Sequence, residues 1–256
     1  MPHPEDVLDQ LVSMSRTLGQ PEWDCVILGE GNTSAKIDGQ TFWVKASGTQ
    51  LPNIQPQHFV KVRFDVVLEL AERESATDEE IKQVLRQATA EKTDLMPSVE
   101  TVMHALLLTL PDVNFVGHTH PTAVNAVLCS KLAEQAVSGR LFPDEIVCCG
   151  PEPVWVPWTE PGPPLAREIR DRVNDYIERN GFRPKIILLQ NHGLVALGAT
   201  VQEVLSATAM AVKTFRILLG TYALGGPNFL PPEMVQRLWT RPDEIYRHKL
   251  LTGREP

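Results

Sequence analysis

Apolar residues recur at helical spacing in several stretches of the chain. The clearest stretch extends from Val7 to Leu18 and is followed by Gly19, a residue type that often ends helices. Thr77 and Ser98 stand where N-caps of two further helices are expected. The pattern predicts helices over residues 7–18, 77–92, 98–110, 122–132, 165–179 and 201–219, and over part of residues 231–250.

Other stretches are short and rich in β-branched and aromatic residues, and they indicate β-strands. The pair Asp38-Gly39 separates two of them and is a strong hairpin signal. Six prolines between residues 151 and 164 predict an extended loop. Because strands and helices alternate irregularly, we expect an α/β fold in which helices cover a mixed or antiparallel sheet. Strands are expected over residues 23–28, 33–37, 41–46, 113–118, 185–189 and 194–197, with further strand-like residues between 60 and 70.

Composition and charge narrow the class of protein. The chain has 256 residues, 43% of them hydrophobic, which is typical of a globular protein with a real core. The net charge of −8 argues against nucleic acid and anionic membrane surfaces as partners. We expect no membrane span, no signal peptide at the acidic N-terminus, and no zinc or disulfide framework among the four cysteines. A reduced, cytoplasmic protein is the simplest interpretation.

A histidine pair carries the most informative chemistry. His118 and His120 follow a strand-like run, and residues two apart in a strand point to the same face. The two imidazoles can therefore bind one metal ion, although such a pair also occurs without a ligand role. His192 lies between two further strand-like runs and would complete a three-histidine site with an open position. All-imidazole ligation favours zinc, with manganese, cobalt and iron as alternatives.

A carboxylate lies upstream of the histidine pair. Glu100 is at the start of a predicted helix, where a glutamate is usually solvated and favoured by the helix dipole. Because this helix is largely apolar and hence buried, Glu100 could instead reach a cleft and act as a base beside the metal. His104, one turn later on the same face, is expected to have a structural role.

Small and polar residues in two turns suggest an anion site. The turn G-E-G-N can present backbone N–H groups, a second turn follows the partner strand, and a serine lies at a helix start. The same features are also explained as tight turns and a helix cap. Lys45 shares a strand face with one of the candidates and could face the same ligand. The candidates are Gly31, Asn32, Ser47, Gly48 and Ser98.

Five motifs occur together in a specific order: G-N-T-S at residues 31–34, A-S-G at 46–48, P-S-V-E-T-V-M-H at 97–104, G-H-T-H-P at 117–121 and N-H-G at 191–193. With them the chain resembles the class II aldolase/adducin family over nearly its whole length, to about residue 225. The phrases P-S-V-E-T and V-K-A-S-G-T-Q-L are most similar to the aldolase domain of bifunctional rhamnulose-phosphate aldolase/dehydrogenase proteins.

The resemblance implies a fold and an assembly. The fold would be one three-layer α/β/α domain over residues 1–256, with a central, mainly antiparallel sheet and a C-terminal extension from about residue 225. The assembly would be a homotetramer with active sites near subunit interfaces.

The resemblance also implies residue roles, carried over from fuculose-phosphate aldolase-like enzymes. Glu100 would be the catalytic acid/base. A second serine of the family's phosphate site is replaced here by Val99, which weakens the phosphate assignment. The zinc ligands would be His118, His120 and His192. The phosphate site would comprise Gly31, Asn32, Ser47, Gly48 and Ser98.

These roles imply a zinc-dependent aldolase that cleaves a ketose 1-phosphate or a related hydroxyketone, with Glu100 moving a proton next to the carbonyl. Sugar-phosphate epimerisation, dehydration and decarboxylation on the same metal site are the alternatives within enzymes. A non-catalytic, adducin-like scaffold is the alternative from another class. Scaffold domains of this kind are expected to lack the full set of metal ligands, and this chain has it.

Overall fold

The computed structural model describes residues 3–73 and 75–253. Within them one sheet of seven strands has the order β3-β2-β1-β4-β7-β6-β5. Every neighbouring pair is antiparallel except β5 and β6, which run parallel. The expected mainly antiparallel sheet is therefore confirmed. The strands are β1 Asn32–Lys36, β2 Thr41–Lys45, β3 Phe59–Arg63, β4 Phe115–Thr119, β5 Val154–Val156, β6 Ile186–Leu189 and β7 Gly193–Gly198.

The predicted hairpin between β1 and β2 closes around Asp38. The Asp38 carboxylate accepts hydrogen bonds from the backbone N–H groups of Gln40 and Thr41, at 2.8 and 2.7 Å. Such side-chain contacts stabilise tight turns and fix the pairing of the strands that follow. On its other side β1 pairs with β4, and Asn32 lies opposite His118. This register places an amide side chain beside a candidate metal ligand.

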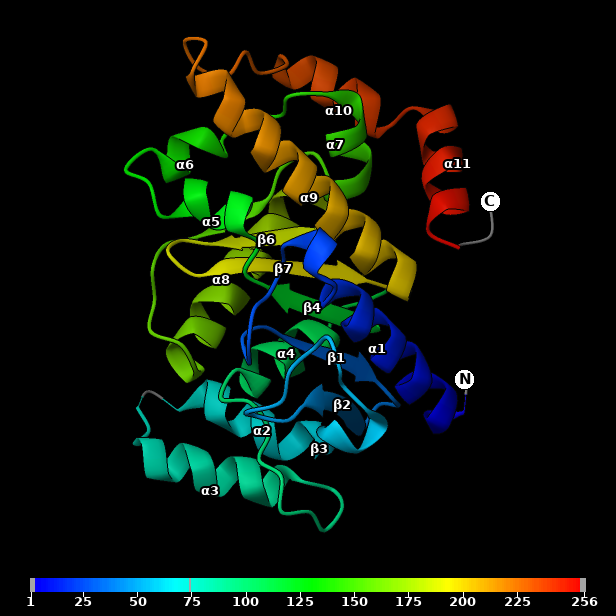
Figure 1. Ribbon diagram of the computed structural model, residues 1–256, viewed down its shortest axis with the longest axis vertical. Coiled ribbons are helices and arrows are strands. Elements are labelled where there is room, and N and C mark those ends of the chain that lie inside the picture. The colour runs from blue at the N-terminus through cyan, green and yellow to red at the C-terminus, as the bar shows by residue number, and fades with distance from the viewer. Residues whose placement is uncertain (1–2, 74, 254–256) are drawn as a thin grey trace.

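Helices cover both faces of the sheet (Figure 1), as the three-layer prediction requires. The first layer contains α1 Pro4–Leu18, α5 Thr122–Leu128, α6 Ala133–Ala136, α7 Pro143–Cys149 and α9 Val201–Tyr222. The second layer contains α2 Phe64–Glu72, α3 Asp78–Ala88, α4 Thr101–Leu108 and α8 Pro163–Asn180. Strand residues alternate between the two cores, so that Phe115 packs on the first layer and Val116 on the second.

Some strand predictions are wrong in detail. Residues 23–28 are not a strand, because Trp23 belongs to the 3-10 turn Pro21–Trp23 and both Asp24 and Leu28 have positive φ, of 53° and 54°. Residues 60–70 combine β3 with α2, which begins at Phe64 and buries its apolar residues at helical spacing. The proline-rich loop contains β5, whose place at the sheet edge tolerates neighbouring prolines.

Helix α9 contradicts the expectation that no apolar run is long enough to cross a membrane. It has 22 residues and reaches a mean hydropathy of 1.3, which satisfies the length and composition of a membrane span. In the structure α9 packs against β7, α5 and α7, and 44% of its most apolar window is buried. Ala207, Ala211 and Phe215 lie on the buried face. The apolar character of α9 is therefore explained by its position in the first layer.

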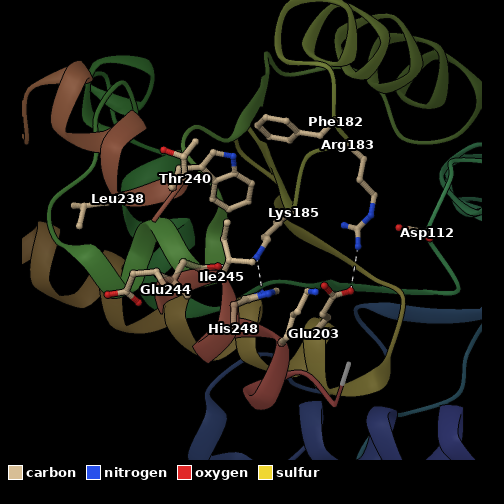
Figure 2. A pocket seen from close by; sticks show the side chains of 13 residues that line it. Asp112, Phe182, Arg183, Lys185, Glu203, Leu238, Thr240, Glu244, Ile245 and His248 are labelled. Carbon is tan, nitrogen blue, oxygen red and sulfur yellow. Dashed lines mark hydrogen bonds and ion pairs between the residues drawn. The ribbon is translucent and has the colours of Figure 1, made fainter. Parts of the chain in front are cut away.

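The chain after α9 forms α10 Pro232–Trp239 and α11 Pro242–Leu251. This segment contacts the sheet through Lys185, which directly precedes β6. Lys185 donates to the Val147 carbonyl at 2.7 Å, and its ammonium lies 2.5 Å from Nε2 of His248 and 5.2 Å from the centre of the Trp239 ring. These contacts border a pocket of about 400 Å³ (Figure 2), at the opposite end of β6 from the turn that carries His192.

Candidate active site

Neighbouring strand ends bring the three predicted histidines together. His118 lies near the end of β4, His120 directly follows that strand, and His192 lies in the turn between β6 and β7. Nε2 of His118 is 3.0 Å from Nε2 of His120 and 3.3 Å from Nε2 of His192. The potential ligand atoms all lie within 4.8 Å of one another. One ion can therefore contact all three side chains.

Contacts on the far side of the rings orient two of these histidines. Nδ1 of His118 lies 3.1 Å from the carbonyl oxygen of Leu194. Because a carbonyl oxygen only accepts, Nδ1 carries the hydrogen and Nε2 keeps a lone pair for a ligand. Nδ1 of His120 lies 3.4 Å from Oε2 of Glu30. Sequence reasoning missed Glu30, and its position inside the glycine-rich turn was the one available signal.

The turn that carries His192 depends on unusual backbone geometry. Asn191 has a positive φ of 55°, a conformation that asparagine adopts more readily than most residues. A Cβ atom on Gly193 would lie 2.7 Å from Cδ2 of His120, closer than side chains approach in real structures. The side-chain amide of Asn125, also missed from the sequence, donates to the His192 carbonyl at 3.0 Å. The N-H-G motif thus combines a residue that forms the turn, a candidate metal ligand, and a glycine that allows the close approach of His120.

Glu100 reaches the same point from the second helix layer. It occupies the N-cap position of α4 and is only 8% exposed. Its Oε2 lies 3.5 Å from Nε2 of His118, and its Oε1 lies 3.2 Å from Nε2 of His192. The side-chain amide of Asn32 donates to Oε2 at 2.7 Å. The structure therefore places the predicted acid/base residue beside the histidines, while its catalytic role stays a prediction.

A buried network holds Asn32 in place. Nε2 of His104 contacts Oδ1 of Asn32, and Nδ1 of His104 lies 2.6 Å from Oγ of Ser34. Burial lowers the pKa of His104 to about 4, so the ring is neutral near pH 7. The neutral ring donates from Nε2 to Asn32 and accepts at Nδ1 from the Ser34 hydroxyl. His104 therefore has the structural position that the sequence predicted.

The protonation states suit a metal ligand set. Burial lowers the pKa of His118 to about 3 and also lowers that of His120, so both rings are neutral near pH 7. Burial alone would raise the pKa of Glu100. The neighbouring His118 and His192, together with the hydrogen bond from Asn32, outweigh this effect and hold the pKa of Glu100 well below its usual range. The Glu100 carboxylate therefore faces the neutral imidazole of His118.

This arrangement fits a cation. Among the residues that the structure describes, the buried Oε1 of Glu100 accepts no hydrogen bond, although Nε2 of His192 is 3.2 Å away. Lone pairs this close repel one another unless a cation or a shared proton lies between them. Imidazole nitrogens with a nearby carboxylate are a common ligand set for divalent metals. The side chains of His118, His120 and His192 are therefore a group that could hold a metal.

The predicted anion-binding residues lie around the same strand ends. Gly31 has a positive φ of 69°, and a Cβ there would lie 2.8 Å from the His118 carbonyl oxygen. Ser47 donates its N–H to the Met96 carbonyl at 2.8 Å, which places the end of β2 beside the segment before Glu100. Gly48, next to Ser47, is exposed and has a φ of 78°. Whether these residues bind phosphate stays a prediction.

Two details of this segment differ from expectation. Ser98 is not the N-cap of α4, because the helix begins at Thr101 and Glu100 occupies the cap position. Instead, Oγ of Ser98 accepts the Glu100 N–H at 3.3 Å and the Asn32 side-chain amide at 3.4 Å. Val99 is 51% exposed and so does not pack in the core. The side chain of Asn32 contacts Glu100 and His104 instead of lining an open pocket.

Comparisons with known proteins extend this description. The model of the Class II Aldolase and Adducin N-terminal domain matches residues 9–219. An uncharacterized oxidoreductase of Bacillus subtilis (strain 168), YuxG, is 29% identical over 80% of this chain, but the chain spans only 28% of that protein. The methylthioribulose-1-phosphate dehydratase of Microcystis aeruginosa is 28% identical over 83% of this chain and 94% of its own length.

Solved structures show the same architecture. The N-terminal class II aldolase domain of a conserved protein from Thermoplasma acidophilum has a TM-score of 0.67 and 28% identity, covering 83% of this chain and 93% of that chain. An L-fuculose 1-phosphate aldolase has a TM-score of 0.67 at 17% identity, covering 91% of this chain and 94% of that chain. At 17% identity, the similarity to the L-fuculose 1-phosphate aldolase shows a shared fold alone.

Proposed function

Because the chain belongs to the class II aldolase and adducin family, we propose that it is a metal-dependent lyase that cleaves a ketose 1-phosphate or a related hydroxyketone by retro-aldol chemistry. The observation that carries this proposal is the convergence of three imidazole nitrogens and the Glu100 carboxylate on one point. A non-catalytic scaffold would have no use for this group of potential ligands, and so we rank that alternative lower.

His118, His120 and His192 would hold the ion, with zinc as the first candidate and manganese, cobalt and iron as alternatives. When bound, such an ion supplies Lewis-acid polarisation of the substrate carbonyl. The Leu194 carbonyl keeps His118 in the tautomer that leaves Nε2 free, and Glu30 does the same for His120 if it accepts from Nδ1.

Glu100 would carry the proton. Retro-aldol cleavage moves one proton from the hydroxyl of the departing carbon to the carbon next to the carbonyl. Glu100 is ionised at neutral pH and held by Asn32, so it can accept this proton and then return it. The network from Ser34 through His104 to Asn32 fixes the orientation of the carboxylate during both transfers.

Dehydration is the second candidate function. The relative from Microcystis aeruginosa, named as a methylthioribulose-1-phosphate dehydratase, aligns over 94% of its own length, whereas the chain spans 28% of YuxG. Dehydration begins at the carbon next to a carbonyl, where a base removes a proton before a hydroxyl leaves as water. Glu100 would carry the proton in this reaction too, but from the carbon to the departing hydroxyl instead of from a hydroxyl to the carbon.

We also propose an anionic group on the substrate, held near Gly31, Asn32, Ser47, Gly48 and Ser98, and a homotetrameric assembly in the cytoplasm. Ile27 and Leu28 support an assembly because they are 72% and 74% exposed in the turn beside Glu30, where a subunit contact would cover them. The four free cysteines agree with a reducing compartment. Light scattering on the purified protein will give the subunit number.

The test of the function is product identification with wild type and Glu100→Gln. We expect a panel of ketose 1-phosphates and unphosphorylated hydroxyketones to give two shorter products if carbon–carbon cleavage occurs, and one product lighter by a water if dehydration occurs. Glu100→Gln should lower turnover roughly a hundredfold or more, because the amide cannot carry the proton. Circular dichroism and metal content will show that the variant is folded and loaded. Turnover close to wild type in such a variant would remove Glu100 from the mechanism.

A further inference from the structure

A pocket of about 400 Å³ lies between the start of β6 and the two C-terminal helices, α10 and α11 (Figure 2). This volume is within the range of sites that bind small molecules. The residues that α10 and α11 contribute to the pocket lie beyond residues 9–219, the part of the chain that matches the family model. Because the pocket is at the opposite end of β6 from the turn that carries His192, a ligand there would be separate from the candidate active site.

Apolar side chains form one wall of this pocket. The ring centres of Phe182 and Trp239 are 5.2 Å apart, and Val147, Leu238 and Ile245 complete the apolar lining. Ile245 is 45% exposed, and none of the residues of α11, Pro242–Leu251, is buried. A flat apolar molecule in the pocket would remove part of this surface from water and add contacts that α11 lacks.

The ammonium group of Lys185 lies in the same pocket and is directed toward His248 (Figure 2). It donates to the Val147 carbonyl at 2.7 Å and lies 2.5 Å from Nε2 of His248, so two of its three N–H groups meet uncharged acceptors when His248 is neutral. Among the residues that the structure describes, no carboxylate forms an ion pair with this ammonium. Burial lowers the pKa of Lys185 to about 8, which leaves the group mostly charged near pH 7.

Three acidic residues also line the pocket, and they do not form an ion pair with this lysine within the described part of the chain. Asp112 and Glu203 lie on the side of Arg183 in Figure 2, and Glu203 binds Arg183 at 3.0 Å. Glu244 pairs with Arg247 at 3.0 Å. The charge of Glu203 raises the pKa of the lysine, but burial lowers it by more. The pocket therefore combines an apolar wall with an ammonium group that can take one further anionic partner.

We propose that this pocket binds a small aromatic carboxylate, with its ring against Phe182 and Trp239 and its carboxylate on the Lys185 ammonium. Hydrogen bonds between two charged groups are stronger than neutral ones, especially where little water is present. Such a ligand would contact the start of β6 and both C-terminal helices, and so it would hold these helices on the sheet. The proposal does not depend on the reaction at the histidines.

The experiment compares phenylacetate with neutral phenylacetamide, which lacks the charge, and with acetate, which lacks the ring. Dissociation constants are measured by calorimetry near pH 7 on metal-loaded wild type, Lys185→Met and the control Lys131→Met, whose lysine is exposed. We expect wild type and the control to bind phenylacetate at least about tenfold more tightly than either of the other two ligands. Lys185→Met should lose most of the preference for phenylacetate over phenylacetamide.

Hydrogen exchange shows where the ligand binds. Phenylacetate should slow exchange in residues 232–251, which form α10 and α11, whereas a carboxylate bound at the histidines would leave this segment unchanged. Three results with wild type alone would overturn the proposal: equal affinity for phenylacetate and phenylacetamide, acetate binding as tightly as phenylacetate (an adventitious anion only), or unchanged exchange in residues 232–251. These results cover the case in which Lys185→Met fails to fold. A folded Lys185→Met with the wild-type preference would overturn it too.

Discussion

Glu30 shows how a single carboxylate can orient a candidate metal ligand. It lies in the turn before β1, where its Oε1 accepts the Ile27 N–H at 2.7 Å and its Oε2 faces Nδ1 of His120 at 3.4 Å. A carboxylate behind a metal-binding histidine fixes the ring and increases the basicity of the opposite nitrogen. Glu30 is thereby anchored to its own turn while it orients a residue at the end of β4.

We predict that Glu30→Gln weakens metal binding by roughly ten- to a hundredfold, the usual effect of removing such a partner. Competition with a chromogenic chelator measures the affinity directly, without any substrate. Glu22→Gln is the matched control, because Glu22 is exposed in the preceding 3-10 turn and, within the described part of the chain, forms no hydrogen bond or ion pair with the histidines. Equal affinities in wild type and Glu30→Gln would show that the contact with His120 has no consequence.

At the scale of elements, the turn between β6 and β7 shows what local sequence can encode. The apolar runs on both sides of His192 predicted two strands, and the structure has them at Ile186–Leu189 and Gly193–Gly198. The sequence also predicted that His192 joins His118 and His120 in one group, and the structure brings the three side chains together. It did not indicate why a glycine follows, because the reason is the neighbouring β4 and the side chain of His120. Contacts between strands distant in sequence decide that position.

We predict that Gly193→Ala lowers both stability and metal affinity. The added Cβ would lie 2.6 Å from the Thr119 carbonyl oxygen and 2.7 Å from His120, so the turn must move away from β4. A cost of about 2 kcal/mol or more in the free energy of unfolding is expected from such overpacking. Chemical denaturation and metal titration measure the two effects. Gly39→Ala is the control, because nothing lies within 4 Å of a Cβ at Gly39; identical behaviour of both variants would contradict the prediction.

Two stretches of the chain were assigned the wrong secondary structure from the sequence. Residues 23–28 look like a strand by composition, but their backbone turns at Leu28 and leaves Ile27 and Leu28 exposed. The composition of a segment shows how many apolar side chains it has, but it does not show where the backbone must bend to reach β1. In residues 60–70 the spacing of the apolar residues changes from that of a strand to that of a helix at Phe64. Each part of this stretch is too short for periodicity alone to distinguish strand from helix. The motif residues were found more reliably because their chemistry is specific.

At the scale of the whole molecule, two regions lie at opposite ends of the same strands. The histidines gather where β4 ends and β7 begins, whereas the C-terminal helices contact the sheet where β6 begins. In Figure 1, α10 and α11 lie at one end of the view and α2 and α3 at the other. Lys185 contributes to this contact, and Figure 2 shows it directed toward His248. Its ammonium lies 5.2 Å from the centre of the Trp239 ring.

We predict a pH-dependent contribution of Lys185 to stability. Burial lowers its pKa from the ordinary 10.5 to about 8. Below pH 8 the lysine is protonated in both states and the folded protein carries the full cost of the buried charge. As the pH rises from about 8 to about 10.5, the folded protein has released a proton that the unfolded chain still holds. The free energy of unfolding of wild type should therefore rise relative to that of Lys185→Met across this window.

Urea titrations of wild type and Lys185→Met at several pH values measure this difference. The exposed Lys131, substituted as Lys131→Met, is the matched control and should give curves parallel to wild type. Parallel curves for Lys185→Met as well would mean that Lys185 releases its proton at the same pH in both states. Such a result would also weaken the assignment of Lys185 as the contact between the sheet and α11.

Removal of the metal is predicted to lower the melting temperature. An ion held by His118, His120 and His192 binds the folded protein and not the unfolded chain, so at a hundredfold excess over its dissociation constant it adds about 2.7 kcal/mol. For a chain of this size that corresponds to roughly 5–10 °C. Calorimetry before and after dialysis against a chelator, followed by addition of zinc, measures the shift. A melting temperature that changes neither on dialysis against the chelator nor on addition of zinc would argue against metal binding by these three histidines.

The spacing of these ligands along the chain has a practical consequence. His118 and His120 lie at the C-terminal end of β4, and His192 lies far downstream between β6 and β7. A shared ion would therefore act as a reversible cross-link between remote parts of the polypeptide. A preparation that lost its ion during purification would then resemble a destabilised mutant, although no residue had changed. Variants should therefore be compared only between samples with the same metal occupancy. When a variant shows a folding defect, its metal content should be measured first.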